Sequence, residues 1–333
     1  EAFEVDALDP KSLAAFLEDV DVVLSCVPYW MHPKVAKVCI ETNTHMVDMG
    51  GDTNVTMETM KLDDQAKSKG VTVIPDTGLA PGLVNDLGNY IIETLDQTEA
   101  VKLYCGGLPQ NPKPPFNYRL VFNIEGLVTE YTDEATVLRD EQIVMVPTLE
   151  EVEKIEIDGL GEMEAFVTSG GTSTAPHTHQ GSVKNYEYKT IRFPGHCERM
   201  KIFKDFGFWD QKKVTVHGEE VEPRELFHVL MAERLRDDSD KDQVVVRGVG
   251  VGTKNGQPYR IQMDIHCLHD DATGFSAMEQ MTGYSTAIYA AAVARGDVPG
   301  GVVRYETAIK GRDFVDAMRK RGIDIKVQEG PAS

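Results

Sequence analysis

The sequence lacks the features that mark several large classes of protein. Its 333 residues contain no apolar run near the roughly 20 residues that a membrane-spanning helix needs, and we find no signal peptide. Only five cysteines occur, at scattered positions and without a Cys-x-x-Cys pair. Such a pattern is typical of a reduced protein rather than of a disulfide framework. We therefore expect a cytoplasmic protein with no membrane association.

Positive charge is also scarce. The chain has 34 lysines and arginines against 54 acidic residues, a formal charge of −20, and no basic patch offsets the surplus. This charge repels phosphate backbones and anionic lipids, so we expect no nucleic-acid or membrane partner and a small molecule as the ligand. The 41% of hydrophobic residues is ordinary for a chain that buries a core, and the length suggests two domains.

The first part of the chain alternates short apolar runs with helical patterns. Strand-like runs occupy 2–8, 21–27, 44–51 and 71–78, and helical patterns lie between them. The run at 21–27 is almost continuously apolar, whereas an antiparallel α+β layer would alternate apolar and polar positions. The pattern predicts a parallel sheet covered on both faces, in a doubly wound, Rossmann-like α/β fold.

After Gly78 the pattern changes, and a helix is predicted at 83–95 before the next strands. Strand-like segments of a mixed or antiparallel sheet are predicted at 100–107, 116–123, 153–160 and 163–171. A further strand-rich stretch covers 212–218, 242–253 and 258–270. A tight hairpin turn is expected at 254–256, where Asn-Gly supplies positive φ angles. A helix rich in small residues at 282–301 is predicted to return to the first sheet. We thus expect a partial Rossmann-like domain of 1–84 and 284–333, an inserted α+β substrate and dimerisation domain of 85–283, and a frayed tail at 327–333.

Three turns of the first domain are candidates for binding a cofactor. In an open parallel sheet, ligands bind beyond the carboxyl ends of the strands, and the turns at 25–32, 47–52 and 74–83 all lie there. Plain tight turns are the alternative. If a dinucleotide binds at this edge, the expected contacts are Ser25, Cys26, Val27, Pro28, Asp48, Gly50, Thr77, Gly78 and Pro81. The usual G-x-G-x-x-G signal has no counterpart before Asp21.

Five segments in order, 21–52, 73–91, 103–131, 164–174 and 188–201, together resemble the saccharopine dehydrogenase superfamily. The elements GGLP, EAF-TSGG and YKT-R-PGH are most similar to lysine 6-dehydrogenase. The resemblance implies NAD, with NADP possible, and oxidation of L-lysine at its ε-carbon to 2-aminoadipate 6-semialdehyde. The alternative it implies is a saccharopine dehydrogenase or reductase, which acts on the secondary amine between lysine or its semialdehyde and glutamate.

The sequence departs from the family pattern at its start, Glu1. The family's first strand, Gly-rich loop, first helix and second strand have no counterpart, so we expect about 60 residues of the cofactor domain to be missing. This departure leads to a second hypothesis about function, in which the protein is not an enzyme. The chain could be a non-catalytic relative that dimerises or binds a ligand.

Oxidation next to an amine needs a base, because an ammonium group with a pKa of about 10.4 cannot release a hydride. One candidate is Glu198. The other candidates are Asp48 and Asp76, which end neighbouring strands, and His196, because histidine titrates near neutrality. Capping of turns and helices is the alternative role for each of these last three.

A substrate carboxylate needs donors such as arginine, hydroxyl and amide groups. The candidates are Tyr118, Thr168, Ser169, Gly170, Arg192 and Arg199. Arg192 is favoured because it lies between two apolar residues. Saccharopine, with three carboxylates, would require several cations from the set Arg119, Lys189, Arg192 and Arg199.

The stretch 266–271, His-Cys-Leu-His-Asp-Asp, resembles a metal site by composition. Histidines three apart in a strand point to opposite faces, so no metal is expected.

Overall fold

The computed structural model describes residues 1–132, 134–237 and 239–332, and it confirms the α/β class. A short parallel sheet contains β1 (Val22–Ser25), β2 (His45–Asp48), β3 (Thr72–Ile74) and β14 (Gly301–Val302), in that order. Helices α1 (Pro10–Phe16), α2 (His32–Thr42), α3 (Thr53–Met60) and α4 (Asp63–Lys69) accompany its strands. On its other face the sheet contacts α10 (Ala277–Ala294).

Both faces of these strands are apolar because both are covered. Met46 and Val73 belong to the hydrophobic cluster under α2, whereas their neighbours Val47 and Ile74 belong to the cluster that includes α10. Successive strand residues point to opposite faces, so covering both faces requires a continuous apolar run. This explains why the strands could be recognised from the sequence.

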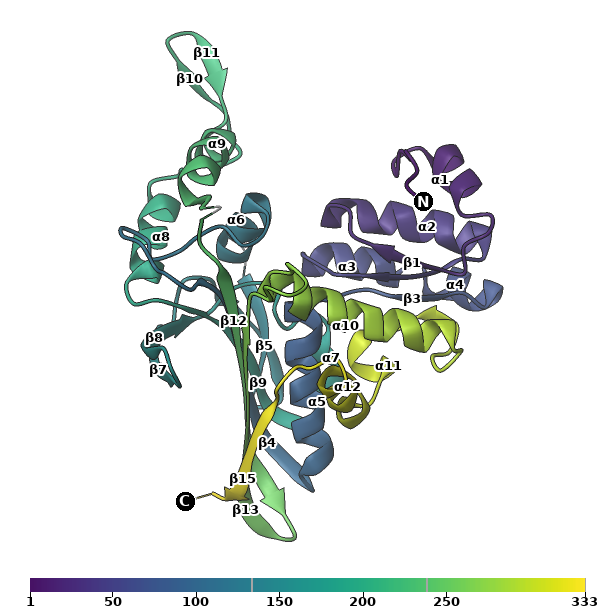
Figure 1. Ribbon diagram of the computed structural model, residues 1–333, viewed down its shortest axis with the longest axis vertical. Helices are drawn as coiled ribbons and strands as arrows, with labels where there is room; N and C mark the ends of the chain where they lie inside the picture. The colour runs from purple at the N-terminus through teal and green to yellow at the C-terminus, as the bar shows by residue number, and fades with distance from the viewer. Residues whose placement is uncertain (133, 238, 333) are drawn as a thin grey trace.

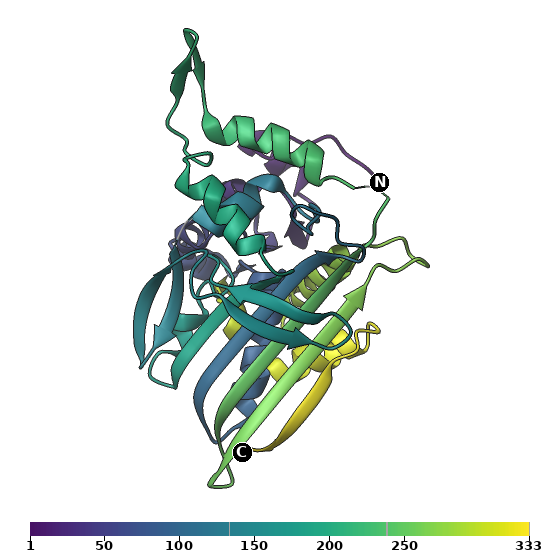
Figure 2. The same ribbon diagram turned by 90° about the vertical axis from the view of Figure 1, so that its left-hand side faces the viewer.

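A long mixed sheet forms the second layer, and its strands lie side by side in Figure 2. Its order is β15 (Lys326–Pro331), β13 (Gln257–Leu268), β12 (Asp242–Lys254), β4 (Gln97–Pro109), β9 (Val183–Arg192), β5 (Glu134–Arg139) and β6 (Gln142–Pro147), with β7 (Glu153–Ile157) and β8 (Gly161–Phe166) joined to β9. The β12–β13 hairpin turns at Asn255 and Gly256, which both have positive φ, as predicted.

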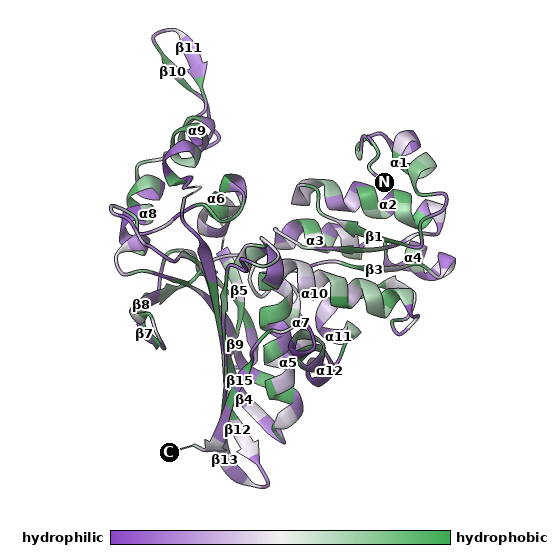
Figure 3. Ribbon diagram, in the orientation of Figure 1, coloured by the Kyte–Doolittle hydropathy of each residue, from purple (hydrophilic) through white to green (hydrophobic). Residues whose placement is uncertain are grey.

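One face of the long sheet packs against helices. These are α5 (Val84–Thr94), α10 and α12 (Gly311–Arg319), whose apolar side chains fill the main core. Figure 3 shows hydrophobic and hydrophilic residues alternating along α5 and α12. Short helices η2 (Leu79–Leu83), α7 (Ala175–His179) and α11 (Tyr305–Ala308) complete this region, whereas η1 (Tyr29–Met31) lies between β1 and α2 of the short sheet.

A third group of elements lies at the far end of the long sheet (Figure 1). It contains α6 (Ile124–Thr132), α8 (His196–Asp205), α9 (Pro223–Leu235) and the hairpin of β10 (Val214–Val216) and β11 (Glu219–Val221). Its core is rich in aromatic side chains, among them Tyr131, Phe166, Trp209 and Phe227. None of the helices in the described ranges has the length and apolarity to cross a bilayer.

Three local predictions are wrong. Residues 2–8 form no strand, because the segment has no neighbouring strand to pair with and turns before α1. Residues 116–123 are irregular, because their aromatic side chains enter the core under α6 and α9 instead of alternating across a sheet. The expected tail forms β15, which pairs with β13, so residues 326–331 lie in the long sheet and not in the first domain.

Candidate active site

A cavity of about 850 Å³ lies between the carboxyl ends of the short parallel sheet and the long sheet. On one side it is lined by the residues that follow β1, β2 and β3, namely Cys26, Val27, Pro28, Tyr29, Trp30, Met49, Gly50, Gly51, Leu79, Ala80 and Pro81. The carboxyl ends of parallel strands meet at one edge of a sheet, so the three predicted turns come together.

The opposite side of the cavity comes from the long sheet and its neighbouring helices. Cys105, Gly107, Tyr188, Thr190 and Arg192 line it from β4 and β9, and Met278, Glu279, Thr282 and Gly283 from the start of α10. The remaining lining residues are Phe122, Asn123, Glu125, Gly126 and Glu130 near α6, and Ser169 and Gly170. Of the residues predicted from sequence, Cys26, Val27, Pro28, Gly50, Pro81, Ser169, Gly170 and Arg192 therefore line one cavity.

Other predicted cofactor residues lie beneath the strand-end turns. Ser25 is buried and shares a hydrogen bond of 3.0 Å with His32 Nδ1. Thr77 is buried and its hydroxyl donates to the Asp48 carbonyl at 2.7 Å. A Cβ on Gly78 would lie 2.7 Å from the carbonyl oxygen of Met49. These residues hold the turns together from below and do not line the cavity.

Asp48 and Asp76 form a buried carboxyl pair under the same turns. The Asp48 carboxylate accepts hydrogen bonds from the amides of Gly50 at 2.8 Å and Asp76 at 3.0 Å. Asp76 accepts one from Thr56 Oγ1 at 3.0 Å and a short one from Ser173 Oγ. Burial and the neighbouring Asp48 carboxylate raise the pKa of Asp76 to about 8, and burial also raises the pKa of Asp48. The pair thus joins two turns and the loop containing Ser173, and it is shielded from the cavity by Gly50.

Arg192 presents a buried guanidinium to the cavity. The side chain is 2% exposed, and its carbon Cζ lies 4.9 Å from the centre of the Tyr118 ring. Its Nε donates to Tyr131 Oη at 3.2 Å and one Nη donates to the Ile191 carbonyl at 3.1 Å. The other Nη lies 4.0 Å from a Glu130 carboxylate oxygen. A substrate carboxylate entering the cavity would find a positioned donor here.

Glu130 is a functional candidate that sequence reasoning missed. It lines the cavity, and 30% of its side-chain surface is exposed. Burial raises the pKa of Glu130 to about 7, although the nearby Arg192 lowers it. A carboxyl that titrates near neutrality in a cleft is suited to proton transfer. Glu130 lies next to the apolar positions Leu127, Val128 and Tyr131 of α6, a helix that was not predicted. The spacing of these apolar residues is the sequence signal that points to the helix containing Glu130.

His196 lies behind Arg192 and is fully buried. Burial, together with the charge of Arg192, lowers the pKa of His196 to about 3. The expectation that this histidine titrates near neutrality is therefore wrong. Its ring contacts Tyr118 and Tyr131.

The other predicted substrate residues are dispersed. Thr168 shares a hydrogen bond of 2.7 Å with Thr190, which lines the cavity. Tyr118 lies under the Arg192 guanidinium. Arg199 instead donates to the Pro194 carbonyl and does not line the cavity.

Charges in the cavity are mostly negative. Among the described lining residues, Arg192 is the one arginine or lysine, whereas Glu125, Glu130 and Glu279 are acidic. Lys189 points elsewhere, since its Nζ donates to the Glu151 carbonyl at 2.8 Å and pairs with Glu153.

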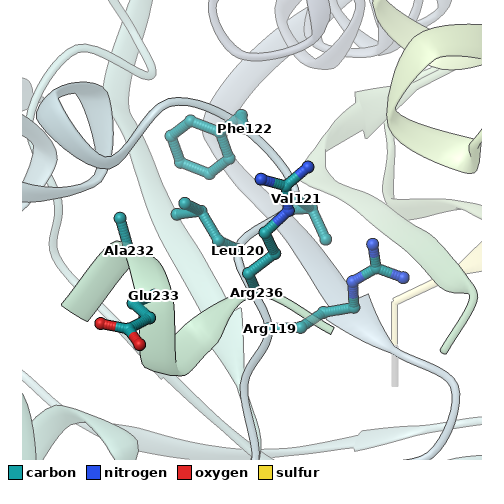
Figure 4. Close-up of a pocket in the computed structure, with 7 residues that line it drawn as sticks. All are labelled: Arg119, Leu120, Val121, Phe122, Ala232, Glu233 and Arg236. Carbon is teal, nitrogen blue, oxygen red and sulfur yellow. The ribbon is translucent and has the colours of Figure 1, made fainter. Parts of the chain in front are cut away.

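A second cavity, of about 600 Å³, lies between residues 119–122 and α9. Figure 4 shows the Arg119 and Arg236 side chains from these two elements directed into the same space. Arg119 also donates to the Asp240 carbonyl. Phe122 lines both cavities.

In residues 1–132, 134–237 and 239–332, no three His, Cys, Asp or Glu side chains are grouped so that they could hold a metal ion. His266 hydrogen-bonds to Gln243 at 2.7 Å, and His269 lies 3.6 Å from Asp271.

The residues present fit a nicotinamide group. The three strand-end turns offer small or apolar residues such as Val27, Gly50 and Pro81 on the side of the cavity that faces Arg192 and Glu130. A volume of about 850 Å³ lies in the range of cofactor and ligand pockets. A flat ring between these two sides would bring a substrate against the polar side.

Comparison with known proteins gives a consistent result. The family model described as saccharopine dehydrogenase NADP binding domain matches residues 1–74, and the model described as saccharopine dehydrogenase C-terminal domain matches residues 78–323. The alpha-aminoadipic semialdehyde synthase of Arabidopsis thaliana is 26% identical over 262 residues, which are 74% of this chain and 24% of that protein. The L-glutamate-forming, NADP(+) saccharopine dehydrogenase of Pyricularia oryzae is 27% identical over 216 residues, 61% of this chain and 47% of that protein. The chain thus spans less than half the length of these two relatives.

Solved structures show the same fold. Apo saccharopine dehydrogenase (L-Glu forming) from Saccharomyces cerevisiae superposes with a TM-score of 0.80 at 19% identity, over 99% of this chain and 89% of that one. Homospermidine synthase from Legionella pneumophila, in complex with NAD, gives a TM-score of 0.64 at 12% identity, over 99% and 80%. The named sequence relatives are saccharopine dehydrogenases and semialdehyde synthases, so the finer expectation of a lysine 6-dehydrogenase finds no support among them.

Proposed function

Because the chain belongs to the saccharopine dehydrogenase family, we propose that it is an NAD(P)-dependent oxidoreductase acting on a carbon–nitrogen bond of an amino acid. The observation that carries this proposal is the pairing of Arg192 with Glu130 on one side of a cavity whose other side is formed by three strand-end turns. Such an arrangement provides a carboxylate anchor and a proton acceptor opposite the place for a nicotinamide ring.

The first candidate substrate is saccharopine, the secondary amine that joins lysine to glutamate. The sequence relatives support it, since several are glutamate-forming saccharopine dehydrogenases. Oxidation of the lysine ε-carbon, on one side of the bridging nitrogen, would give an imine, and its hydrolysis would release glutamate and the semialdehyde.

The second candidate is L-lysine, and the charge of the cavity favours it. Saccharopine has three carboxylates, whereas the described lining residues include a single arginine, Arg192, among three glutamates. A substrate with one carboxylate and two amino groups suits that balance better.

The chain's own residues would act as follows. The bound nicotinamide supplies the hydride acceptor. Arg192 holds a carboxylate of the substrate, and Glu130 in its ionised form takes a proton from the amine nitrogen. Loss of this proton would leave the nitrogen with a free electron pair for the carbon–nitrogen double bond. Tyr188, Phe122 and Leu79 line the cavity and limit the entry of water.

We propose NAD as the cofactor with NADP as the alternative, a division into 1–84 with 284–325 and 85–283, and a homodimer formed through the long sheet. A cytoplasmic location is supported by the five cysteines, which are all free thiols.

The test is an assay of the purified full-length protein with L-saccharopine or L-lysine, each with NAD and NADP, that follows reduced-nicotinamide absorbance. Turnover of saccharopine is expected, and turnover of lysine alone would select the second candidate. Arg192→Ala should raise the KM of the amino acid by at least about tenfold and leave that of the nucleotide unchanged. The matched control is Arg199→Ala, an arginine outside the cavity. Absence of turnover with both amino acids and both nucleotides would refute the proposal.

A further inference from the structure

A row of buried polar groups lies directly behind Arg192. Arg192 Nε is 3.2 Å from Tyr131 Oη, and the same Oη is 3.1 Å from His196 Nε2. His196 Nδ1 lies 3.4 Å from the carbonyl oxygen of Phe116. Tyr131 and His196 are 0% exposed and Arg192 is 2% exposed, so these groups satisfy one another rather than bulk water.

Chemistry fixes the direction of every hydrogen bond in this row. A carbonyl oxygen only accepts, so the proton between Phe116 and the ring sits on His196 Nδ1. In a neutral imidazole the other nitrogen, Nε2, is then an acceptor, and the Tyr131 hydroxyl donates to it. The Tyr131 oxygen is left with lone pairs, and it accepts from Arg192 Nε, which can only donate.

The opposite tautomer has no consistent arrangement. A proton on Nε2 would point at Tyr131 Oη, which already receives the Arg192 Nε proton. The lone pair of Nδ1 would then face the Phe116 carbonyl oxygen, and the Tyr131 proton would lack this acceptor. Unsatisfied buried groups cost about 1–3 kcal/mol each, so the first direction is strongly preferred.

Aromatic packing holds the histidine ring in place. The His196 ring is stacked on Phe166, with ring centres 6.4 Å apart and an angle of 14°. The Tyr118 ring meets it edge-on at 5.2 Å, and the same Tyr118 ring lies under the Arg192 guanidinium. The ring therefore cannot turn to offer another nitrogen without disturbing the surface on which Arg192 rests.

From this geometry we propose that His196 and Tyr131 are positioning residues, which direct the Arg192 guanidinium into the cavity through a one-directional chain of hydrogen bonds. The hydrogen-bond chain occupies Nε of Arg192 and thereby leaves Nη2 of the guanidinium for the substrate carboxylate. His196 accordingly exchanges no proton with the substrate. The inference rests on the proposed function only in naming a carboxylate as the group that Arg192 binds.

The first experiment needs no turnover. Nitrogen-15 NMR of the full-length protein, with labelled histidine and assignment by His196→Gln, reports which imidazole nitrogen carries the proton. A neutral ring with its proton on Nδ1 from pH 6 to 8 is expected. A proton on Nε2, or on both nitrogens, would overturn the proposal.

The second experiment measures KM and kcat in variants. Tyr131→Phe removes the acceptor for Arg192 Nε and should raise the KM of the amino acid about tenfold, while kcat and the KM of the nucleotide stay within about twofold. His196→Leu removes the acceptor for Tyr131 and should have a similar effect. His196→Gln, whose Oε1 can accept in the place of Nε2, should restore most of the loss. His266→Gln is the matched control, since that histidine hydrogen-bonds outside the cavity.

The outcomes separate this inference from the proposed function. An unchanged KM in folded Tyr131→Phe, or a loss of kcat with unchanged KM in His196→Leu, would overturn the positioning role. Should the buried leucine prevent folding, Tyr131→Phe and the NMR measurement still decide. If neither amino acid is oxidised, the proposed function fails, and the protonated nitrogen of His196 still supports or refutes the hydrogen-bond chain.

Discussion

The buried carboxyl pair predicts a stability that falls as the pH rises. Asp76 keeps its proton in the folded protein up to about pH 8, because burial and the Asp48 carboxylate raise its pKa, whereas an aspartate in the unfolded chain ionises near pH 3.9. Between these values the folded state binds one more proton than the unfolded state. Stability is therefore fully present below about pH 4 and is lost as the pH rises toward 8.

Asp76→Asn removes this titration with little other change. Asparagine is uncharged and of nearly the same shape. Its amide oxygen can accept the hydrogen bond from the Thr56 hydroxyl, as Asp76 does, and its NH2 group can donate to the Ser173 hydroxyl oxygen. It also tolerates the left-handed backbone at this position, where φ is 66°. The substitution thus tests the charge separately from the packing.

The size of the effect follows from the slope of the unfolding free energy against pH. One proton of difference changes the free energy of unfolding by about 1.4 kcal/mol per pH unit, so the Asp76 contribution between pH 5 and 7 is at most about 3 kcal/mol. Asp86 and Glu306, whose pKa values are also raised by burial, add to the slope of the native chain. The difference between the native chain and Asp76→Asn isolates the single carboxyl.

The assay is urea unfolding at pH 5, 6, 7 and 8. Asp76→Asn should gain stability relative to the native chain as the pH rises, by about 1 kcal/mol per unit. The exposed Asp313→Asn serves as the control and should leave the slope unchanged. Equal slopes in the native chain and Asp76→Asn would refute the reasoning, because the pair would then be ionised in the folded state.

Two further predictions concern the cavity. If Glu130 is the base, kcat/KM should fall about tenfold per pH unit below pH 7. Glu130→Gln should abolish this fall at low pH and lower kcat at least about 100-fold. Persistence of the fall in the variant would exclude Glu130. Gly171→Ala should destabilise the protein by about 1–3 kcal/mol in thermal unfolding, because a Cβ there collides with the ring of Tyr188. The neighbouring Gly170→Ala meets no atom within 4 Å and should cost only the strain of its positive φ, about 1 kcal/mol, so an equal loss in both would contradict this view.

The cofactor side of the site could be predicted well from the sequence. Apolar runs covered on both faces revealed the parallel strands, and parallel strands place their carboxyl ends at one edge. Cys26, Gly50 and Pro81, far apart in the chain, therefore meet in one cavity. Which side chains at these turns are buried could not be predicted. Asp48 lies two positions before Gly50 and Asp76 five positions before Pro81, and yet both carboxyl groups are buried beneath the turns.

The substrate side was harder to predict. Glu130 belongs to α6, which follows an irregular, proline-rich segment. Neither the helix nor that segment has an apolar pattern periodic enough to show which side chain faces the cavity. His196 was selected for the pKa of an isolated histidine, but its burial beside Arg192 reverses that argument. Long-range burial determines both outcomes, and local sequence does not encode it.

The late strand β14 has a consequence for how the chain is made. It pairs with β3 through Gly301 and Thr72, so the edge of the short sheet is closed by a segment that leaves the ribosome roughly 230 residues later. At about 5–20 residues per second, that delay is roughly 10 to 45 s. Throughout this time the edge of β3 is unpaired and α10, which covers the sheet, is absent or incomplete. A nascent chain therefore exposes an unprotected strand edge during synthesis, the kind of edge that chaperones shield and that stalled or truncated products leave open to aggregation.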